Sequence, residues 1–203
     1  MSMSSIESLA ELFQKFPGIG PRQAYRFVYY LLRQNPSYRK ELIRNIEALG
    51  LNTHQCDSCF RFFEGTGNTC NICKDKTRDD SSLLIVEKDT DLDAIERSYT
   101  YKGRYAILGG TRMLANDRAP LYESRVISHV KELSKKGTLK EIIFALSATP
   151  DGEYTTSKLR ESLRTIVDEN KVTFTTLGRG LSTGSELEYA DPETLKNALT
   201  NRK

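Results

Sequence analysis

The sequence lacks a long apolar run, a signal peptide and a large excess of charge of one sign. No stretch of the 203 residues is apolar over the length that a bilayer requires, so we expect no membrane span. The first five residues lack the basic region and apolar core of a signal peptide, and we therefore expect a cytoplasmic protein. The net charge is only +3, which by itself does not indicate a nucleic-acid partner.

Cysteine is scarce, and all four cysteines fall in two C-x-x-C pairs. The first pair is Cys56 with Cys59 and the second is Cys70 with Cys73, and ten residues separate the pairs. Four thiolates complete the tetrahedral shell that structural zinc prefers, without the nearby His54. Disulfides are rare in a cytoplasmic protein, and a redox pair needs only one C-x-x-C. The spacing therefore predicts one structural zinc ion per chain.

The sequence has the length and composition of a folded protein with one large or two small domains. Hydrophobic residues make up 38% and charged residues 28%, as in a globular class. Residues 1–50 contain seven basic and four acidic side chains, so the whole net charge of +3 belongs to this segment. Such an excess supports binding to DNA, but it is equally typical of a solvated surface.

A glycine-rich turn followed by two arginines stands out within this basic segment. Gly18 and Gly20 can adopt positive φ and allow another backbone to come close. Pro21 is suited to the first helical position, and the amides of a helix start favour an anion. Arg22 and Arg26 are four residues apart and share a helix face. The motif predicts a phosphate-binding hairpin that reads no bases; the alternative is an ordinary turn between helices with a solvated basic face.

Helical periodicity dominates the first quarter of the chain. Ser4 and Glu7 form a capping box, Asn35 is suited to a helix N-cap, and Gly50 to the position after a helix end. We predict a small helical domain over residues 1–53, with helices at about 4–16, 21–34 and 36–49.

In the second half, short apolar runs alternate with helical patterns, which predicts a mostly parallel sheet covered by helices. Residues 74–82 are polar and read as a connector. The whole is an α+β, multi-domain chain with a zinc finger over 54–78, an α/β domain over 79–176 and a C-terminal segment over 177–203. We expect strands at 83–86, 104–108, 141–146 and 172–175, and helices at 90–98, 122–136, 153–169 and from 191.

Acidic residues follow two of the expected strands. Glu87 ends the first strand, and Asp151 and Glu153 follow the third. The carboxyl ends of parallel strands meet at one edge, where these oxygens could converge on Mg²⁺. Alternatively, Asp151 and Glu153 belong to a helix start, where acids are favourable. The sequence leaves both interpretations open.

Taken together, the ordered motifs resemble the RecR family of bacterial recombination mediators along nearly the whole chain. The matching pieces are Phe16-Pro-Gly-Ile-Gly-Pro-Arg-Gln-Ala24, the cysteine pairs ending in Cys70-Asn-Ile-Cys73, Leu84-Ile-Val-Glu87, Gly103-Arg-Tyr105, Gly152-Glu153, Arg179-Gly-Leu181 and Leu187-Glu-Tyr-Ala190.

This resemblance implies a helix-hairpin-helix unit, a four-cysteine zinc finger and a Toprim domain in a protein of DNA repair that is not an enzyme. It implies a homo-oligomer, a dimer or tetrameric ring, that holds duplex DNA without sequence preference. RecO and, in many cases, RecF act with such proteins to load the RecA recombinase at single-strand gaps. The family's DNA contacts fall on Arg22 and Arg26, and its partner-binding acids on Glu87 and, less directly, on Asp151 and Glu153.

The sequence departs from related proteins in two loops. Catalytic Toprim enzymes carry two aspartates where this chain has Ser147 and Thr149, which argues against catalysis and against a catalytic Mg²⁺. Residues 111–118 replace the family's usual loop, so RecF binding does not follow from the resemblance. The alternatives are a Mg²⁺-dependent nuclease or topoisomerase-like enzyme, and a zinc-stabilised adaptor whose hairpin only packs.

Overall fold

The computed structural model describes residues 3–168, 171–178, 180–181, 184 and 186–200, and it divides into two compact units. Unit 1 ends at Thr53 and unit 2 begins at His54. Each unit has its own core and is described by itself.

Unit 1 consists of three helices, α1 (Ser5–Gln14), α2 (Pro21–Arg33) and α3 (Pro36–Asn52). Helices α1 and α2 pack around a small core of Ala10, Ala24 and Val28. Helix α3 buries none of its residues within the unit. The unit therefore holds together mainly through the contact between α1 and α2.

The predicted caps of these helices are present. The Ser4 amide donates to the Glu7 carboxylate at 2.9 Å, and the Glu7 amide donates to the Ser4 hydroxyl at 3.3 Å, which completes the capping box. Asn35 caps α3 by accepting a hydrogen bond from the Tyr38 amide. The expected end of α3 at Gly50 is wrong, because the helix continues to Asn52.

Unit 2 is built on a four-stranded sheet in which every pairing is parallel, as predicted. The strand order is β4-β3-β5-β6, so β3 and β5 are central. The bounds are β3 (Asp79–Val86), β4 (Gly103–Ile107), β5 (Glu141–Ala145) and β6 (Thr173–Thr176). The central strands carry fully buried side chains such as Leu83, Ile85 and Ile142, as expected of a sheet that is covered on both faces.

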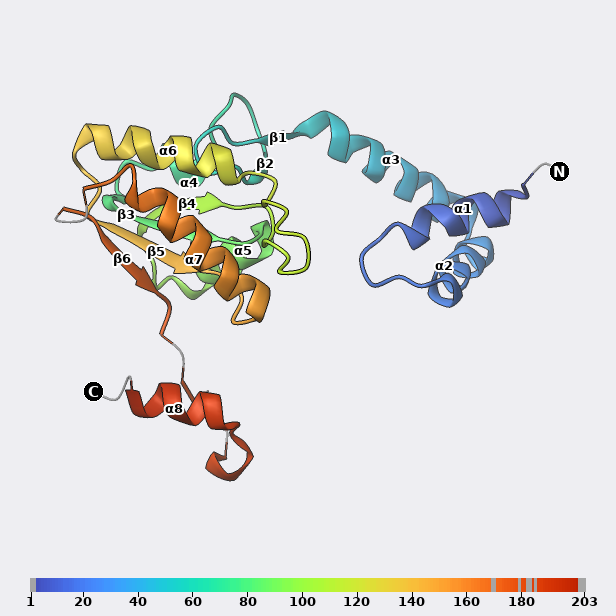
Figure 1. Ribbon diagram of the computed structural model, residues 1–203. Coiled ribbons are helices and arrows are strands. Elements are labelled where there is room, and N and C mark those ends of the chain that lie inside the picture. Colours follow the sequence, from blue (N-terminus) through green and yellow to red (C-terminus); the bar gives the residue numbers. More distant parts are fainter. Residues whose placement is uncertain (1–2, 169–170, 179, 182–183, 185, 201–203) are drawn as a thin grey trace. The chain divides into compact units, whose positions relative to one another are not determined.

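Three helices connect these strands. They are α5 (Asp89–Ser98), α6 (Glu123–Lys136) and α7 (Pro150–Arg164). Helices α6 and α7 contact each other and lie side by side against the sheet (Figure 1). Along the sheet, the chain moves one way from β3 to β4 and the opposite way from β4 to β5 and from β5 to β6. Because such crossovers are right-handed, α5 lies on the face of the sheet opposite to α6 and α7. Helix α7 begins earlier than expected and ends at Arg164.

The cysteine segment belongs to unit 2, except for its first residue, Thr53, and shares the core of that unit. It contains β1 (Thr53–Gln55), β2 (Phe62–Glu64) and the short helix α4 (Asn71–Lys74), none of which the sequence pattern indicates. Three of the four cysteines lie in the same buried cluster as the strands of the sheet. The predicted polar connector to residue 82 is wrong, because β3 already begins at Asp79, where the amide of Asp79 donates to the Lys102 carbonyl.

The described C-terminal residues form a short 3-10 turn (Leu187–Tyr189) and helix α8 (Pro192–Thr200). Arg179, part of the tail motif, lies outside the described residues, as does the expected end of the helix at residue 169. Across the described part of the chain, no helix has both the length and the apolar character needed to cross a membrane.

Candidate functional site

The hairpin of unit 1 places two glycines in different backbone conformations. Gly18 adopts φ +76°, the left-handed region that favours glycine, and turns the chain out of α1. Gly20 has an ordinary φ of −83°, so it does not use the positive φ that glycine permits. No heavy atom lies within 4 Å of the Cβ position of either glycine, which leaves open space beside both backbones.

The start of α2 has no side-chain cap. Gly20 is the N-cap and Pro21 the first helical residue, and neither offers a side-chain oxygen to the helix amides. The Gln23 amide donates to the Gly20 carbonyl, whereas the Arg22 amide donates no backbone hydrogen bond among the described residues. The positive end of the helix dipole therefore remains available to an anion.

Arg22 and Arg26 are both exposed on α2, whereas Ala24 and Val28 of the same helix point into the core. The Arg26 guanidinium donates to the Gln23 side chain at 3.2 Å, which keeps it beside the helix start. The first turn of α2 contains no acidic residue to neutralise these cations. The hairpin thus presents two exposed cations on the helix that begins at Pro21.

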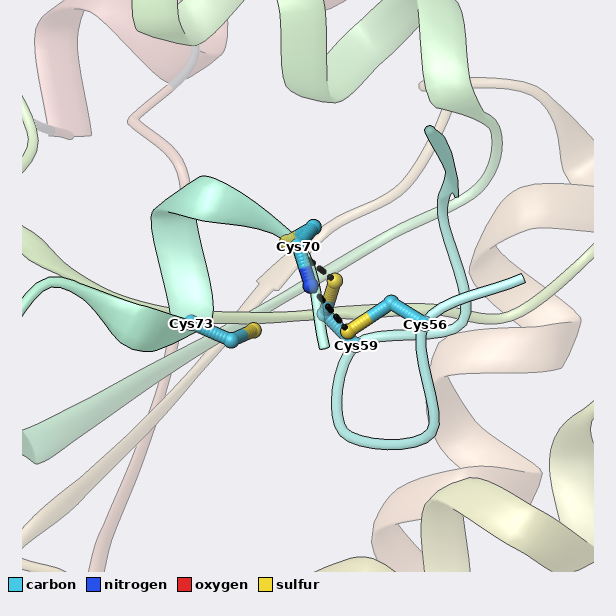
Figure 2. A group of neighbouring side chains, drawn as sticks. All are labelled: Cys56, Cys59, Cys70 and Cys73. Carbon is cyan, nitrogen blue, oxygen red and sulfur yellow. Dashed lines mark hydrogen bonds between the residues drawn. The ribbon is translucent and has the colours of Figure 1, made fainter. Parts of the chain in front are cut away.

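The metal centre is a cluster of all four cysteines, whose ligand atoms lie within 4.8 Å of one another. Cys56 and Cys59 come from the loop between β1 and β2, Cys70 precedes α4, and Cys73 lies within it (Figure 2). The first three are fully buried. A closed, sulfur-only set of four donors suits a structural metal ion and leaves no position for a substrate.

The hydrogen bonds within this cluster favour the deprotonated form of Cys56, whereas they raise the pKa of Cys59 and Cys73. The pKa of Cys56 is lowered, chiefly by a hydrogen bond from the Cys59 thiol. Hydrogen bonds from the thiols of Cys70 and Cys73 lower it further. The Cys70 amide also donates to the Cys56 sulfur at 3.4 Å (Figure 2). Since metals bind the thiolate form, these donors help to prepare Cys56 as a ligand.

At the carboxyl edge of the sheet, Glu87 is partnered by Ser147. Glu87 follows β3 and Ser147 follows β5, and the chain leaves these adjacent strands toward opposite faces of the sheet. The Ser147 hydroxyl donates to Glu87 Oε2 at 2.5 Å, and Lys88 Nζ lies 3.2 Å from Oε1. Glu87 is 7% exposed, and each of its two carboxylate oxygens has one of these partners.

Asp151 and Glu153 lie in the first turn of α7, whose N-cap is Thr149. Asp151 Oδ1 accepts a hydrogen bond from the Leu114 amide at 2.9 Å, so this carboxylate binds the loop of residues 111–118. Among the described residues, only the four cysteines form a group of potential metal ligands. The convergence of Glu87, Asp151 and Glu153 around Mg²⁺ is therefore not found.

One arginine, which the sequence analysis did not single out, organises this loop. Arg112 donates to both oxygens of Glu123, at 3.0 and 2.6 Å, and to the carbonyl and carboxylate of Asp117. The Arg112 amide donates to the buried hydroxyl of Thr155 on α7. No local pattern could reveal this role, because its partners lie 5, 11 and 43 residues away and follow no repeat.

The structure combines three features: a helical hairpin with two exposed arginines, a buried cluster of four cysteines, and a parallel sheet with Glu87 at its carboxyl edge. Together they define a multi-domain protein of the helix-hairpin-helix and Toprim class. Comparison with known families agrees: residues 6–49 match "RecR, helix-hairpin-helix", residues 81–176 match "Toprim domain", and residues 180–203 match "RecR, C-terminal". The chain belongs to the RecR family of recombination proteins.

Curated relatives extend this similarity over the full length. The chain is 36% identical to the recombination protein RecR of Ruegeria sp. (strain TM1040), over 98% of this chain and 96% of that protein. It is 33% identical to RecR of Paenarthrobacter aurescens (strain TC1), over 100% and 98%. RecR of Bifidobacterium longum subsp. infantis is 36% identical over 98% and 96%.

Proposed function

We propose that this protein is a DNA-binding recombination mediator in DNA repair, which holds duplex DNA through the hairpin of unit 1 and catalyses no reaction. The observation that carries the proposal is the pair of exposed arginines, Arg22 and Arg26, beside a helix start without a side-chain cap. The relatives are named as recombination proteins, and that activity requires a contact with DNA.

The chemistry of this hairpin suits phosphate groups rather than bases. Two guanidinium groups and the positive end of α2 attract a phosphate, and Gly18 and Gly20 leave room for the nucleic-acid backbone. Phosphate contacts position a protein on DNA but carry no sequence information. We therefore propose sequence-independent binding, with contacts made by Gly18, Gly20, Arg22 and Arg26.

The test is a titration of duplex DNA across a salt series with matched double variants. Arg22→Ala/Arg26→Ala should weaken binding and flatten the dependence of log K on log salt by about 1.8, since each lost phosphate contact contributes about 0.9. Arg33→Ala/Arg44→Ala removes the same charge from exposed positions of unit 1 and should leave the slope near that of the wild type. If the two double variants bind alike, the hairpin is not the DNA site, and a protein-interaction adaptor becomes the better reading.

We propose that the Toprim domain is a scaffold rather than an active site. Ser147 stands beside Glu87 and supplies a hydroxyl, so this corner lacks the second carboxylate that a two-metal mechanism needs. We assign no catalytic role to Mg²⁺. Cleavage of DNA that depends on Mg²⁺ and disappears in Glu87→Gln would overturn this part of the proposal and favour a nuclease or topoisomerase-like enzyme.

For the four-cysteine centre we propose one structural zinc ion per chain. Four thiolates in a tetrahedral shell are typical of structural zinc, and soft sulfur ligands disfavour Mg²⁺ or Ca²⁺. The measurement is the metal content of the purified protein by elemental analysis. A chain that is folded and free of metal would contradict the proposal, because metal binding and local folding are coupled.

We propose that this protein acts with RecO to load RecA at single-strand gaps. We propose RecF as a further partner only if the loop of residues 111–118 allows it to bind. Glu87, Asp151 and Glu153 are proposed as contacts for these proteins at the carboxyl edge of the sheet. The adjoining loop of residues 111–118 presents the exposed side chains of Met113 and Leu114, so its sequence bears on whether RecF binds. The proposed location is the cytoplasm, where bacterial DNA lies.

A further inference from the structure

Strand β4 forms one edge of the sheet, and its free side faces the cysteine segment rather than another strand. Among the strands of the described residues, β4 pairs with β3 alone. The Ile107 amide, which does not pair with β3, donates to the Cys59 carbonyl at 2.9 Å. The first C-x-x-C pair is thereby bound to the edge of the sheet through the backbone carbonyl of Cys59, which is itself a candidate metal ligand.

The second C-x-x-C pair is bound to the same strand through Arg104. Its Nη1 donates to the Ile72 carbonyl at 3.2 Å and to the Cys73 carbonyl at 3.1 Å. These carbonyls lie at the end of α4, where a helix leaves its last carbonyl groups without partners. The short helix that carries Cys73 is therefore completed by a side chain from β4.

The guanidinium of Arg104 is itself held in place. Its Nε donates to Asp80 of β3 at 2.6 Å, and its side chain is only 17% exposed. An arginine can make these contacts together because its donors form a rigid, planar fork. A lysine offers a single point of charge and cannot reach the carboxylate of Asp80 and both carbonyls at once.

We propose that β4 is the template of the metal centre and that Arg104 is a positioning residue for it. One strand binds both cysteine pairs at sites three residues apart, so the sheet sets the distance between the pairs. The four ligand atoms accordingly lie within 4.8 Å of one another, and the sulfurs of Cys59 and Cys70 are 3.6 Å apart. A site that is ordered in advance loses less entropy when the ion binds.

This inference rests on the proposed zinc site but not on the proposed contact with DNA. Groups that hold metal ligands from outside the coordination shell change metal affinity by about 10- to 100-fold when they are removed. Arg104 acts in this way through backbone carbonyls, and it touches no sulfur in the contacts described.

The experiment measures the rate at which zinc passes from the full-length protein to a chromophoric chelator. Arg104→Gln should release zinc about tenfold faster or more, with Arg104→Lys between it and the wild type. The matched control is Arg61→Gln, because Arg61 is also in the cysteine segment and its side chain is 18% exposed, but its ion pair is with Asp93 of α5. The control should release zinc at nearly the wild-type rate.

A second readout separates positioning of the ligands from general stability. Protein loaded with Co²⁺ reports the geometry of its sulfur ligands in the visible absorption bands, and Arg104→Gln should shift these bands while Arg61→Gln should not. Equal release rates and unchanged bands in Arg104→Gln would overturn the inference. If Arg104→Gln does not fold, Arg104→Lys decides by the same two measurements; a wild-type protein that binds no zinc would overturn the metal site as well.

Discussion

Gly18 and Gly20 are two residues apart but serve the hairpin in different ways. Gly18 is required by its backbone, since an L side chain is strained at φ +76°. Gly20 is not, because its φ is −83° and a Cβ there meets no atom within 4 Å. The value of glycine at position 20 thus lies in the open helix start rather than in the turn.

Position 20 therefore allows helix stability and DNA affinity to be changed in opposite directions. Gly20→Asp should stabilise unit 1 by a few tenths of a kcal/mol, since aspartate is a favourable N-cap. The same carboxylate should repel phosphate and weaken duplex binding severalfold. Thermal unfolding and fluorescence anisotropy with labelled duplex measure the two effects.

The control at this position is Gly20→Asn, which also caps the helix but adds no charge. It should keep more of the DNA affinity than Gly20→Asp. Equal affinities of the two variants would show that phosphate does not approach the start of α2.

At the scale of elements, the loop of residues 111–118 is fastened to α6 and α7 by a charged network. The pKa of Arg112 is raised, chiefly by its hydrogen bonds to Glu123, whose side chain is only 6% exposed. Tyr154 of α7 donates to the Asp117 carboxylate, which lowers the pKa of Asp117. A loop held by two helices can present a defined surface to a partner.

Removing the arginine of this network should cost much more than removing an ordinary surface charge. Arg112→Ala leaves the buried Glu123 carboxylate without its main partner, so we expect a loss of about 3 kcal/mol in the free energy of unfolding. The double variant Arg112→Ala/Glu123→Gln should recover part of this loss, because it removes the buried charge. Urea denaturation provides the measurement.

The comparison is Lys158→Ala, which breaks an exposed ion pair with Glu161 on α7 and should cost less than about 1 kcal/mol. A similar small loss in Arg112→Ala would mean that the network does not stabilise the fold.

At the scale of the whole molecule, unit 1 taken by itself has a large apolar surface that its own helices do not cover. A groove of about 710 Å³ lies between its three helices, and α3 buries none of its own residues. The groove is lined mainly by apolar side chains, including Leu9, Phe13, Leu32, Ile43 and Ile46. An apolar groove of this kind is typical of a surface that another chain covers. We propose that this chain forms a homo-oligomer in which a second copy covers the groove.

A charge placed in this groove should therefore dissociate the assembly. Ile43→Glu puts a carboxylate on the apolar surface and should shift the mass measured by light scattering toward the 23.0 kDa of one chain. Asn45→Glu adds the same charge to an exposed polar position of α3 and should leave the mass unchanged. If Ile43→Glu keeps the wild-type mass, the oligomer forms through another surface.

The sequence by itself determined the features that depend on neighbours a few residues apart. The Ser4–Glu7 capping box, the Asn35 cap and Pro21 at the helix start were all predictable, because their contacts close within one turn. The two C-x-x-C pairs predicted a metal site for the same reason, since the two cysteines of each pair are three residues apart. The alternation of short apolar runs with helical patterns indicated the parallel sheet.

Only the tertiary structure decided the contacts between distant segments. Ser147 meets Glu87 across 60 residues, and Arg104 reaches the Cys73 carbonyl across 31. The start of β3 at Asp79 was missed because its polar first residues carry no strand pattern and are held by pairing with the chain before β4. Such contacts depend on which strands lie side by side, and strand order is set by the packing of the whole domain rather than by any local run of residues.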